Sequence, residues 1–437
     1  MRTLSFILAL CLALAAAACH RLPWASRAEK AALEQKVAPD VRRIATLKGE
    51  APVIVRLDVG PGLDSMTPAD RATAIERASA DALAEIPSKE VRVVHRYQIV
   101  PIVSAWASPE GLVELARRPG VKEIVLDRLD AESLDKSVRL IGADSVWPTS
   151  TGLNRYVAIL DTGIDRAHPF FGGRVAFEAC FRKDGKCPVP GYAQIGTGAA
   201  QSITRGHGTH VAGIAAGGYA VSSGIVLKGV APGAKIIAIN VFSAGGSYVG
   251  DQVKALEHVA MLKQTGISVV AANLSLGDGV KYVSACDFQE KERKPVIDRL
   301  LALGVATVVA AGNESQSGAV SAPGCISSAV TVSAVTNADK MSPWHNRSRV
   351  LTDLAAPGEQ IRSSMPNGQY ADDTGTSMAA PHVSGAIALL SSAAPTKSLN
   401  EILGALSSTG TEITDPATGV KYRRINVRAA LAQLTGN

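Results

Sequence analysis

The stretch GTSMAAPHVSGAIALL, from Gly375 to Leu390, places one serine between small residues where a glycine-containing loop gives way to an apolar helical run. Small neighbours let a second backbone approach Ser377. A helix that begins here directs free N–H groups and the positive end of its dipole toward an anion beside the hydroxyl. Pro381 is expected near the start of this helix, because proline deeper in a helix removes a hydrogen bond. The stretch predicts either a buried small-residue helix or the presentation of a nucleophile.

Three further stretches carry the other groups that a serine nucleophile needs. His207 lies between two glycines in RGHGTHVAGIAAG, and Asp161 follows an apolar run in YVAILDTGID. Asn313 follows another apolar run in VATVVAAGNES, and its amide can donate a hydrogen bond to an oxyanion. In open α/β sheets, such residues gather at the carboxyl ends of strands. We therefore expect these residues to form one catalytic site with Ser377.

The blocks DTGID, GHGTHVAG, AAGN and GTSMAAPHVSG, in this order, resemble the four signature blocks of the subtilisin-like serine proteases. The order Asp, His, Ser is that of subtilisin and differs from the orders of chymotrypsin and the α/β-hydrolases. The resemblance covers roughly residue 138 to the end of the chain. It implies that Ser377 is the nucleophile, His207 the general base and then acid, and Asp161 the group that orients the imidazolium. Asn313 and the Ser377 backbone N–H would form the oxyanion hole.

The region from residue 136 to residue 437 alternates apolar strand patterns with helical ones. Such a pattern predicts a mostly parallel sheet with helices on both faces, which is also the α/β subtilisin-like fold that the resemblance implies. The expected strands cover residues 235–242, 268–276, 305–310, 330–335 and 351–355, and the expected helices cover residues 251–263, 295–303, 398–406 and 426–434.

Residues 1–18 contain one early arginine and a leucine- and alanine-rich run that ends in Ala16-Ala17-Ala18. This pattern predicts a signal peptide, so we expect a secreted or extracytoplasmic protein. Cys19 follows the cleavage site directly and is a candidate for lipidation. Signals for lipidation usually carry leucine three residues before the cysteine, where this chain has Ala16, so both alternatives stay open. Membrane attachment is expected only through such an N-terminal lipid.

Residues 19–50 form an alanine-rich arm with interspersed charge, which we expect to be solvent-exposed and either helical or flexible. Residues 51–135 follow the order strand, helix, two strands, helix, strand, which predicts a small α+β ferredoxin-like domain. This domain resembles the propeptides that assist the folding of subtilisin-like proteases and then inhibit them. An unrelated ferredoxin-like module is the alternative. The resemblance implies an autoprocessed zymogen, cut between about residues 127 and 137.

Apart from Cys19, four cysteines lie beyond the leader, and such an even number is typical of disulfides in an exported protein. We favour the pairs Cys180–Cys187 and Cys286–Cys325 among the three pairings that four cysteines allow. No CxxC spacing or nearby histidine favours a metal site, and the expected chemistry requires no cofactor. Calcium stabilises many subtilisin-like proteases, but Phe170 stands where many of them carry aspartate, so structural calcium stays unassigned.

Two segments resemble the edges between which these proteases hold a peptide as an added strand. They are Gly245-Gly246-Ser247 and Ser275-Leu276-Gly277, and Tyr248 and Leu276 would line a pocket for the fourth residue before the scissile bond. The pocket for the P1 residue, directly before that bond, would lie between residues 275–277 and residues 310–314, which include Ala311 and Gly312, with Ser321 near its floor. No buried acid is evident there, so we expect a broad endopeptidase with apolar or medium-sized P1 residues.

The net charge of +6 and the isoelectric point near 9.0 are modest for 437 residues and are not concentrated in a basic helix. They give no reason to expect nucleic-acid binding. We expect a monomer whose partners are protein or peptide substrates and its own propeptide. Two alternatives are a dedicated maturation protease for one partner protein and an inactive binding protein on the same fold. The intact set of Asp161, His207, Asn313 and Ser377 disfavours the second.

Overall fold

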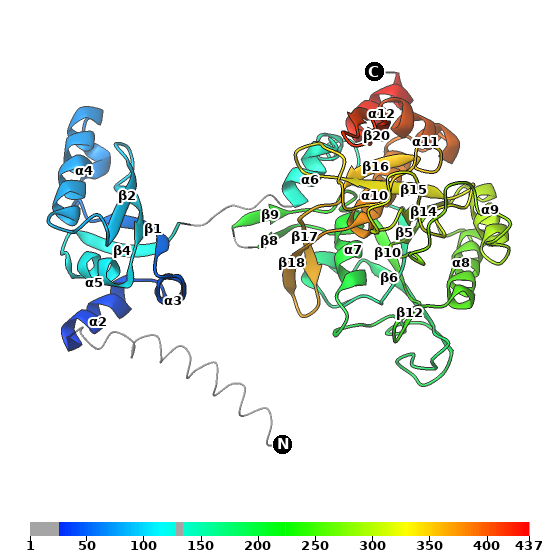
Figure 1. Cartoon of the computed structure of the whole chain (residues 1–437), viewed down its shortest axis with the longest axis horizontal. Helices are drawn as coiled ribbons and strands as arrows, with labels where there is room; N and C mark the ends of the chain where they lie inside the picture. The colour runs from blue at the N-terminus through cyan, green and yellow to red at the C-terminus, as the bar shows by residue number, and fades with distance from the viewer. Residues whose placement is uncertain (1–25, 128–133, 223, 437) are drawn as a thin grey trace. The chain divides into compact units, whose positions relative to one another are not determined.

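The computed structural model describes residues 26–127, 134–222 and 224–436. The chain divides into two compact units, Met1–Asp130 and Ala131–Asn437 (Figure 1). Each unit has a hydrophobic core of its own. None of the helices in the described ranges is both long enough and apolar enough to span a membrane.

The smaller unit contains a four-stranded antiparallel sheet with the strand order β2-β3-β1-β4. Residues of β1 alternate in burial, with Val53 and Val55 in the core, because successive side chains of a strand point to opposite faces. The elements follow the β-α-β-β-α-β order expected from the sequence. They are β1 (Ala51–Leu57), α4 (Pro68–Leu83), β2 (Val91–Arg96), β3 (Ile102–Ala107), α5 (Pro109–Arg117) and β4 (Val121–Leu126), with a 3₁₀ turn η1 (Leu63–Ser65) before α4.

The expectation of a solvent-exposed arm over residues 19–50 is wrong for its described part. Helices α2 (Arg27–Lys36) and α3 (Pro39–Lys48) pack on the sheet of the smaller unit. Leu33 of α2 and Val41 and Ala45 of α3, the last two at helical spacing, are buried with Val37, which lies between the helices, and the alanine-rich composition hid these apolar positions. The smaller unit therefore includes residues before position 51. The buried positions are Leu33, Val37, Val41 and Ala45.

The larger unit is built on a ten-stranded sheet of order β19-β20-β16-β15-β14-β13-β5-β10-β6-β7. The strands from β20 to β6 in this order pair in parallel, and β19 and β7 add antiparallel edges. Their bounds are β5 (Tyr156–Asp161), β6 (Val175–Phe181), β7 (Ala193–Ile195), β10 (Lys235–Asn240), β13 (Val269–Leu274), β14 (Ala306–Ala310), β15 (Val330–Val335), β16 (Leu354–Pro357), β19 (Thr411–Thr414) and β20 (Lys421–Arg424).

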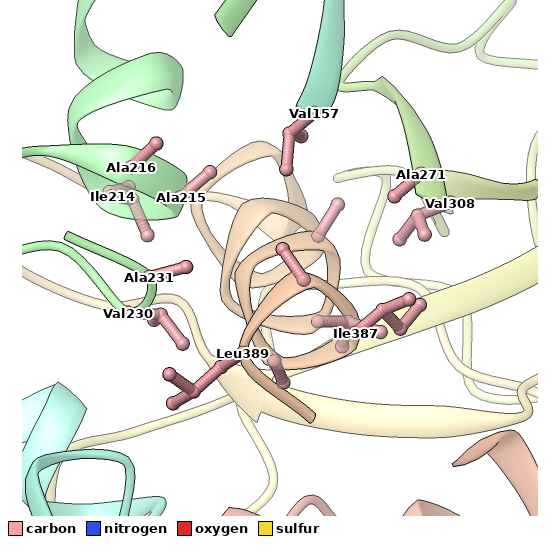
Figure 2. Close-up of a cluster of buried hydrophobic side chains, with 14 of the residues drawn as sticks. Val157, Ile214, Ala215, Ala216, Val230, Ala231, Ala271, Val308, Ile387 and Leu389 are labelled. Carbon is pink, nitrogen blue, oxygen red and sulfur yellow. The ribbon is translucent and has the colours of Figure 1, made fainter. Parts of the chain in front are cut away.

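Helices cover both faces of this sheet, as the apolar strand patterns predicted. On β5, Val157 belongs to one core cluster and Ala158 to the other, since the strand is buried on both sides. Figure 2 shows part of the first cluster, to which β5 contributes Val157, α7 contributes Ile214 and α10 contributes Ile387. The helices on this side are α7 (His207–Ala216), α10 (Thr376–Ala393), α11 (Leu399–Ser408) and α12 (Val427–Thr435), and those on the other are α8 (Val249–Gln264) and α9 (Lys294–Ala302).

Short elements and hairpins complete the larger unit. The hairpins join β8 (Ala220–Ser222) to β9 (Ile225–Leu227), β11 (Phe242–Ser243) to β12 (Gly246–Ser247), and β17 (Ile361–Met365) to β18 (Gln369–Asp373). The unit also contains α6 (Leu134–Leu140), η2 (Asp144–Val146) and η3 (Pro169–Phe171). Disulfides join Cys180 to Cys187 and Cys286 to Cys325, which are the pairs that we favoured from the sequence.

Helices α7 and α10 cross closely at a glycine. A Cβ atom at Gly385 would lie 2.7 Å from the carbonyl oxygen of Ala215, so a larger residue would force the helices apart. Both helices begin at the edge of the sheet where β5 ends, which brings the first turns of α7 and α10 to Asp161.

Candidate active site

Asp161 and His207 form the central contact of the site. His207 Nδ1 lies 2.8 Å from Asp161 Oδ1 and 3.0 Å from Oδ2. Asp161 is fully buried as the last residue of β5, whereas His207 begins α7 and is half-buried. With Nδ1 donating to the carboxylate, the Nε2 atom of a neutral imidazole is free to accept a proton.

The backbone around this pair explains why small residues flank His207. A Cβ atom at Gly208 would lie 2.3 Å from the carbonyl oxygen of Gly163, so only glycine permits this approach of α7 to the end of β5. Thr162 Oγ accepts a hydrogen bond from the Gly208 N–H at 3.0 Å, and Asp161 Oδ1 accepts one from the Thr162 N–H at 2.7 Å. These contacts fix the carboxylate relative to the imidazole. Sequence reasoning missed Thr162, although it directly follows Asp161.

The electrostatic environment raises the pKa of His207. Burial by itself lowers this pKa, but the charge and the hydrogen bond of Asp161 outweigh it, and the charge of Asp373 raises the pKa further. Arg205, two residues before His207, has the opposite effect on the pKa. His207 is therefore a stronger base than a free imidazole.

Ser377 lies in the first turn of α10, on the same edge of the sheet. Its Oγ donates a long hydrogen bond of 3.4 Å to the carbonyl oxygen of Ser275. Within the described ranges, no hydrogen bond joins this hydroxyl to His207, and contacts of this kind are often loose in proteins without substrate. Pro381 lies deeper in the helix than the sequence suggested, one turn beyond Ser377.

Asn313 is held beside Ser377 by Thr376. The Asn313 Oδ1 atom accepts hydrogen bonds from the Thr376 N–H at 2.9 Å and from its Oγ1 at 3.0 Å. Because the amide oxygen is occupied in this way, the Nδ2 group is left to donate to a ligand. The oxygen of a tetrahedral intermediate at Ser377 would need such a donor. Thr376 is a further positioning residue that sequence reasoning missed.

The two predicted substrate segments lie on different elements. Gly245, Gly246 and Ser247 belong to the β11–β12 hairpin, and Tyr248, which is half exposed, precedes α8. Ser275, Leu276 and Gly277 directly follow β13, so they continue from a parallel strand into the site. The second segment is joined to the nucleophile by the Ser275–Ser377 contact. No described contact joins the hairpin to Ser377 directly.

An acidic side chain lies at the predicted P1 pocket. Glu314 Oε2 accepts a hydrogen bond from Ser321 Oγ at 3.0 Å and another from Asn346 Nδ2. Asn346 also donates to the Ala311 carbonyl at 3.2 Å, and a Cβ atom at Gly312 would lie within 2.6 Å of all three side chains. Glu314 itself is exposed, so it does not contradict the expectation that the P1 pocket contains no buried acid. It nevertheless brings a carboxylate against the predicted pocket floor.

The other histidines near the signature blocks have structural contacts. His382 Nδ1 donates to the Met378 carbonyl, and its Nε2 lies 2.8 Å from Ser137 Oγ. His210 Nε2 donates to the Ala371 carbonyl, and His168 Nε2 to that of Gln369. Burial lowers the pKa values of all three, to about 4 for His210 and His382. They are neutral at pH 7 and are not positioned against Ser377.

The position of Phe170 does not fit a cation. This side chain is buried and packs edge-on against Tyr370, with ring centroids 5.6 Å apart, and it offers no oxygen ligand. In the described part of the chain, no group of three or more histidine, cysteine, aspartate or glutamate side chains is arranged to hold a metal ion.

A doubly covered parallel sheet with Asp161, His207 and a helix-start serine at one edge defines the class of protein as an α/β serine hydrolase. A model described as the subtilase family matches residues 152–423. The chain is 30% identical to subtilisin E of Bacillus subtilis (strain 168) over 354 residues, which cover 79% of this chain and 84% of that protein. It is 31% identical to an alkaline protease of Alkalihalobacillus alcalophilus over 335 residues, 76% of this chain and 80% of the relative.

A solved protease structure from Pseudoalteromonas arctica PAMC 21717 shares the fold. It is 24% identical, with a TM-score of 0.57 over 67% of this chain and 94% of that one. The chain belongs to the subtilase family and is a subtilisin-like serine peptidase, so its substrates are proteins or peptides. Two disulfides are typical of proteins that work outside the cytoplasm.

Proposed function

We propose that the protein is an extracytoplasmic serine endopeptidase that acts through Asp161, His207 and Ser377 and matures by cutting its own precursor. The contact between His207 Nδ1 and the buried Asp161 carboxylate carries this proposal, because it sets the tautomer that a general base requires.

The reaction proceeds through an acyl-enzyme. His207 Nε2 takes the proton from Ser377 Oγ as that oxygen attacks the peptide carbonyl, and Asp161 stabilises the imidazolium. Asn313 Nδ2 and the Ser377 backbone N–H donate to the oxyanion of the tetrahedral intermediate. His207 then gives its proton to the leaving amine, and a water molecule that it activates releases the acyl group.

The substrate lies as an added strand between residues 245–248 and residues 275–277. Unpaired backbone groups of both segments bind its main chain, and Tyr248 and Leu276 line a pocket for the fourth residue before the scissile bond. The P1 side chain enters between residues 275–277 and Ala311-Gly312. Apolar and medium-sized P1 residues are preferred, and Glu314 is available to pair with a lysine.

The smaller unit acts as an inhibitory propeptide. Its β-α-β-β-α-β sheet and its place before the catalytic unit support this role. The predicted cut between residues 127 and 137 coincides largely with positions outside the described residues. The signal peptide and Cys19 also lie outside them, so lipidation of Cys19, which would tether the precursor to a membrane, stays a proposal. The mature enzyme acts as a monomer without a cofactor, and a structural calcium ion remains unassigned.

The first experiment compares the full precursor with its Ser377→Ala variant by intact mass and N-terminal sequence. Loss of about 110 to 120 residues beyond the leader in the wild type alone is expected, because the proposed cut precedes the catalytic unit. Identical cutting of both forms would show that another protease matures the chain. Casein hydrolysis by the mature enzyme supports a broad endopeptidase, whereas its absence would favour a maturation protease for one partner.

A further inference from the structure

Residues 244–248, which we call the substrate edge, make few contacts within their own hairpin that would hold them in place. This hairpin, β11–β12, pairs only Phe242 with Ser247 and Ser243 with Gly246. Gly245 in the turn and Gly246 at the start of β12 have φ values of +88° and +154°, which residues with side chains rarely adopt. A two-stranded hairpin of this length is marginally stable in water, so other contacts must hold it in place.

The turn closed by the Cys180–Cys187 disulfide provides such contacts. Cys180 lies in β6, and the two cysteines are seven residues apart in sequence. Within the turn, Arg182 donates to both carboxylate oxygens of Asp184, at 3.1 and 2.6 Å, and the Lys186 N–H donates to Oδ1 at 3.1 Å. The turn is therefore a rigid unit that presents Asp184 and Lys183.

Three contacts join this turn to the substrate edge and to the start of α8. The backbone N–H of Ala244, directly before the two glycines, is close enough to Asp184 to lower the pKa of its carboxylate. The Lys183 N–H donates to Asp251 Oδ2 at 2.8 Å, and the Lys183 ammonium lies 5.2 Å from the centre of the Tyr248 ring. The contacts thus reach both ends of residues 244–248.

The opposite side of the hairpin is joined to the segment before His207. Arg205 Nη1 donates to the carbonyl oxygens of Phe242 at 3.3 Å and Ser243 at 3.1 Å, and its guanidinium lies over the Phe242 ring. The hairpin is therefore held between the start of α7 and the disulfide turn. Hydrogen bonding to Arg182 lowers the pKa of Asp184 to about 2, so this carboxylate stays charged above that pH.

We propose that the Cys180–Cys187 turn holds the Ala244–Tyr248 edge in the conformation that binds an extended peptide, with Asp184 as the positioning residue. The inference rests on the proposed function, because the turn would position residues that bind the substrate in that same site. Loss of this support should affect long peptide substrates and not short ones. Residues that lie well before the scissile bond depend on this edge, whereas a substrate with only a P1 residue does not.

The test uses the mature enzyme with Asp184→Asn and two peptides that share the P1 residue and the leaving group. One peptide has four residues before the scissile bond and the other has only one. We expect the ratio of kcat/KM for the long and short peptides to fall about ten-fold or more, as the loss of a hydrogen bond to a charged group predicts. Titration with a sulfonyl fluoride normalises each rate to the concentration of active enzyme.

Asp339→Asn is the matched control. Asp339 also accepts two hydrogen bonds from one arginine, Arg424, at 2.9 and 2.8 Å, but it has no described contact with the hairpin. This variant is expected to keep the ratio. A Cys180→Ala/Cys187→Ala variant should lower the ratio as Asp184→Asn does, whereas Cys286→Ala/Cys325→Ala should not.

A second readout does not depend on activity. In the Ser377→Ala background, Asp184→Asn should speed amide hydrogen exchange in residues 242–248 and leave the segment before His207 unchanged. Unchanged exchange in the hairpin, or an equal loss of kcat/KM on both peptides, overturns the support role. If the parent enzyme cleaves neither peptide, the proposed function fails, and the exchange result still decides whether the turn supports the hairpin.

Discussion

The Ser275 hydroxyl donates to the carbonyl oxygen of Ser377 at a distance of 2.7 Å. This carbonyl is the one that Pro381, four residues later, cannot bond, since proline has no N–H. Ser275 Oγ also accepts a hydrogen bond from the buried Asn273 at 2.9 Å. The proline thus frees a carbonyl in the nucleophile's own residue, and the proposed substrate segment after β13 is joined to it.

Ser275→Ala should lower kcat/KM about ten-fold and reduce the melting temperature, because the part-buried Ser377 carbonyl and the buried Asn273 amide each lose a partner. Peptide hydrolysis and calorimetry on the Ser377→Ala background measure the two effects. Ser392→Ala is the control, since Ser392 lies on the same helix and donates to the Leu153 carbonyl at 3.0 Å. Equal losses of activity in the two variants would contradict a link between Ser275 and the nucleophile.

Asn313→Asp isolates the proposed oxyanion donor. A carboxylate can still accept the hydrogen bonds of Thr376, so the loop should keep its structure, but it has no N–H to donate. We expect kcat to fall at least 100- to 1,000-fold with little change in KM. Burst titration separates the loss of acylation from a loss of folded protein. A KM effect without a kcat effect would place Asn313 in substrate binding instead.

The pH dependence should reflect the raised pKa of His207. Only the neutral imidazole accepts the serine proton, so kcat/KM should rise with pH through a value above 6.5. Asp373→Asn removes a charge that raises this pKa and should move the rise in kcat/KM toward lower pH.

Asp372→Asn is the matched control for that shift. Asp372 is the neighbouring residue, but its carboxylate is paired with Arg362 at 2.9 Å. The charges that shift the pKa of His207 are those of Asp161, Asp373 and Arg205, and Asp372 is not one of them. Its profile should match that of the parent enzyme. A shift of equal size in both variants would assign the effect to net charge and not to Asp373.

The sheet and the position of the site could be predicted because their causes are local in sequence. An apolar run that ends in Asp161 is typical of a buried parallel strand. The glycines beside His207 indicate that two backbones approach closely there, and a Cβ atom at Gly208 would indeed lie only 2.3 Å from the Gly163 carbonyl oxygen. The four sequence blocks therefore predict which strands end, and which helices begin, at the site. The disulfide pairs could also be favoured, since one of them closes a short turn.

Other features depend on contacts between distant segments and leave no local pattern. Ser275 and Ser377 are 102 positions apart, and nothing in either segment predicts that one supplies the partner that Pro381 removes from the other. The sequence before residue 51 predicts a solvent-exposed arm, because alanine and charged residues predominate in it. Only packing on the sheet shows that Leu33 of α2 and Val41 of α3 are buried in the core of the smaller unit.

His382 should make the fold sensitive to acid. Burial lowers its pKa to about 4, so the unfolded state binds a proton below pH 6.5 that the folded state does not. The free energy of unfolding therefore falls as the pH drops from 6.5 toward 4, by about 3 kcal/mol from this residue. Urea unfolding of Ser377→Ala at several pH values measures the slope. In His382→Gln the slope should become shallower, and an unchanged slope would contradict the assignment.

Glu314→Gln tests the chemistry of the proposed P1 pocket. The carboxylate contacts Ser321 Oγ, so it can pair with a lysine at P1, whereas the amide cannot. The ratio of kcat/KM for lysine over leucine at P1 should fall about two- to five-fold, as is typical of a partly exposed ion pair. Glu412→Gln is the control, because Glu412 of the edge strand β19 pairs with Lys421 and Arg423 of the neighbouring strand β20. An unchanged ratio would place the pocket elsewhere, and strict cleavage after arginine or lysine by the parent enzyme would contradict the apolar preference.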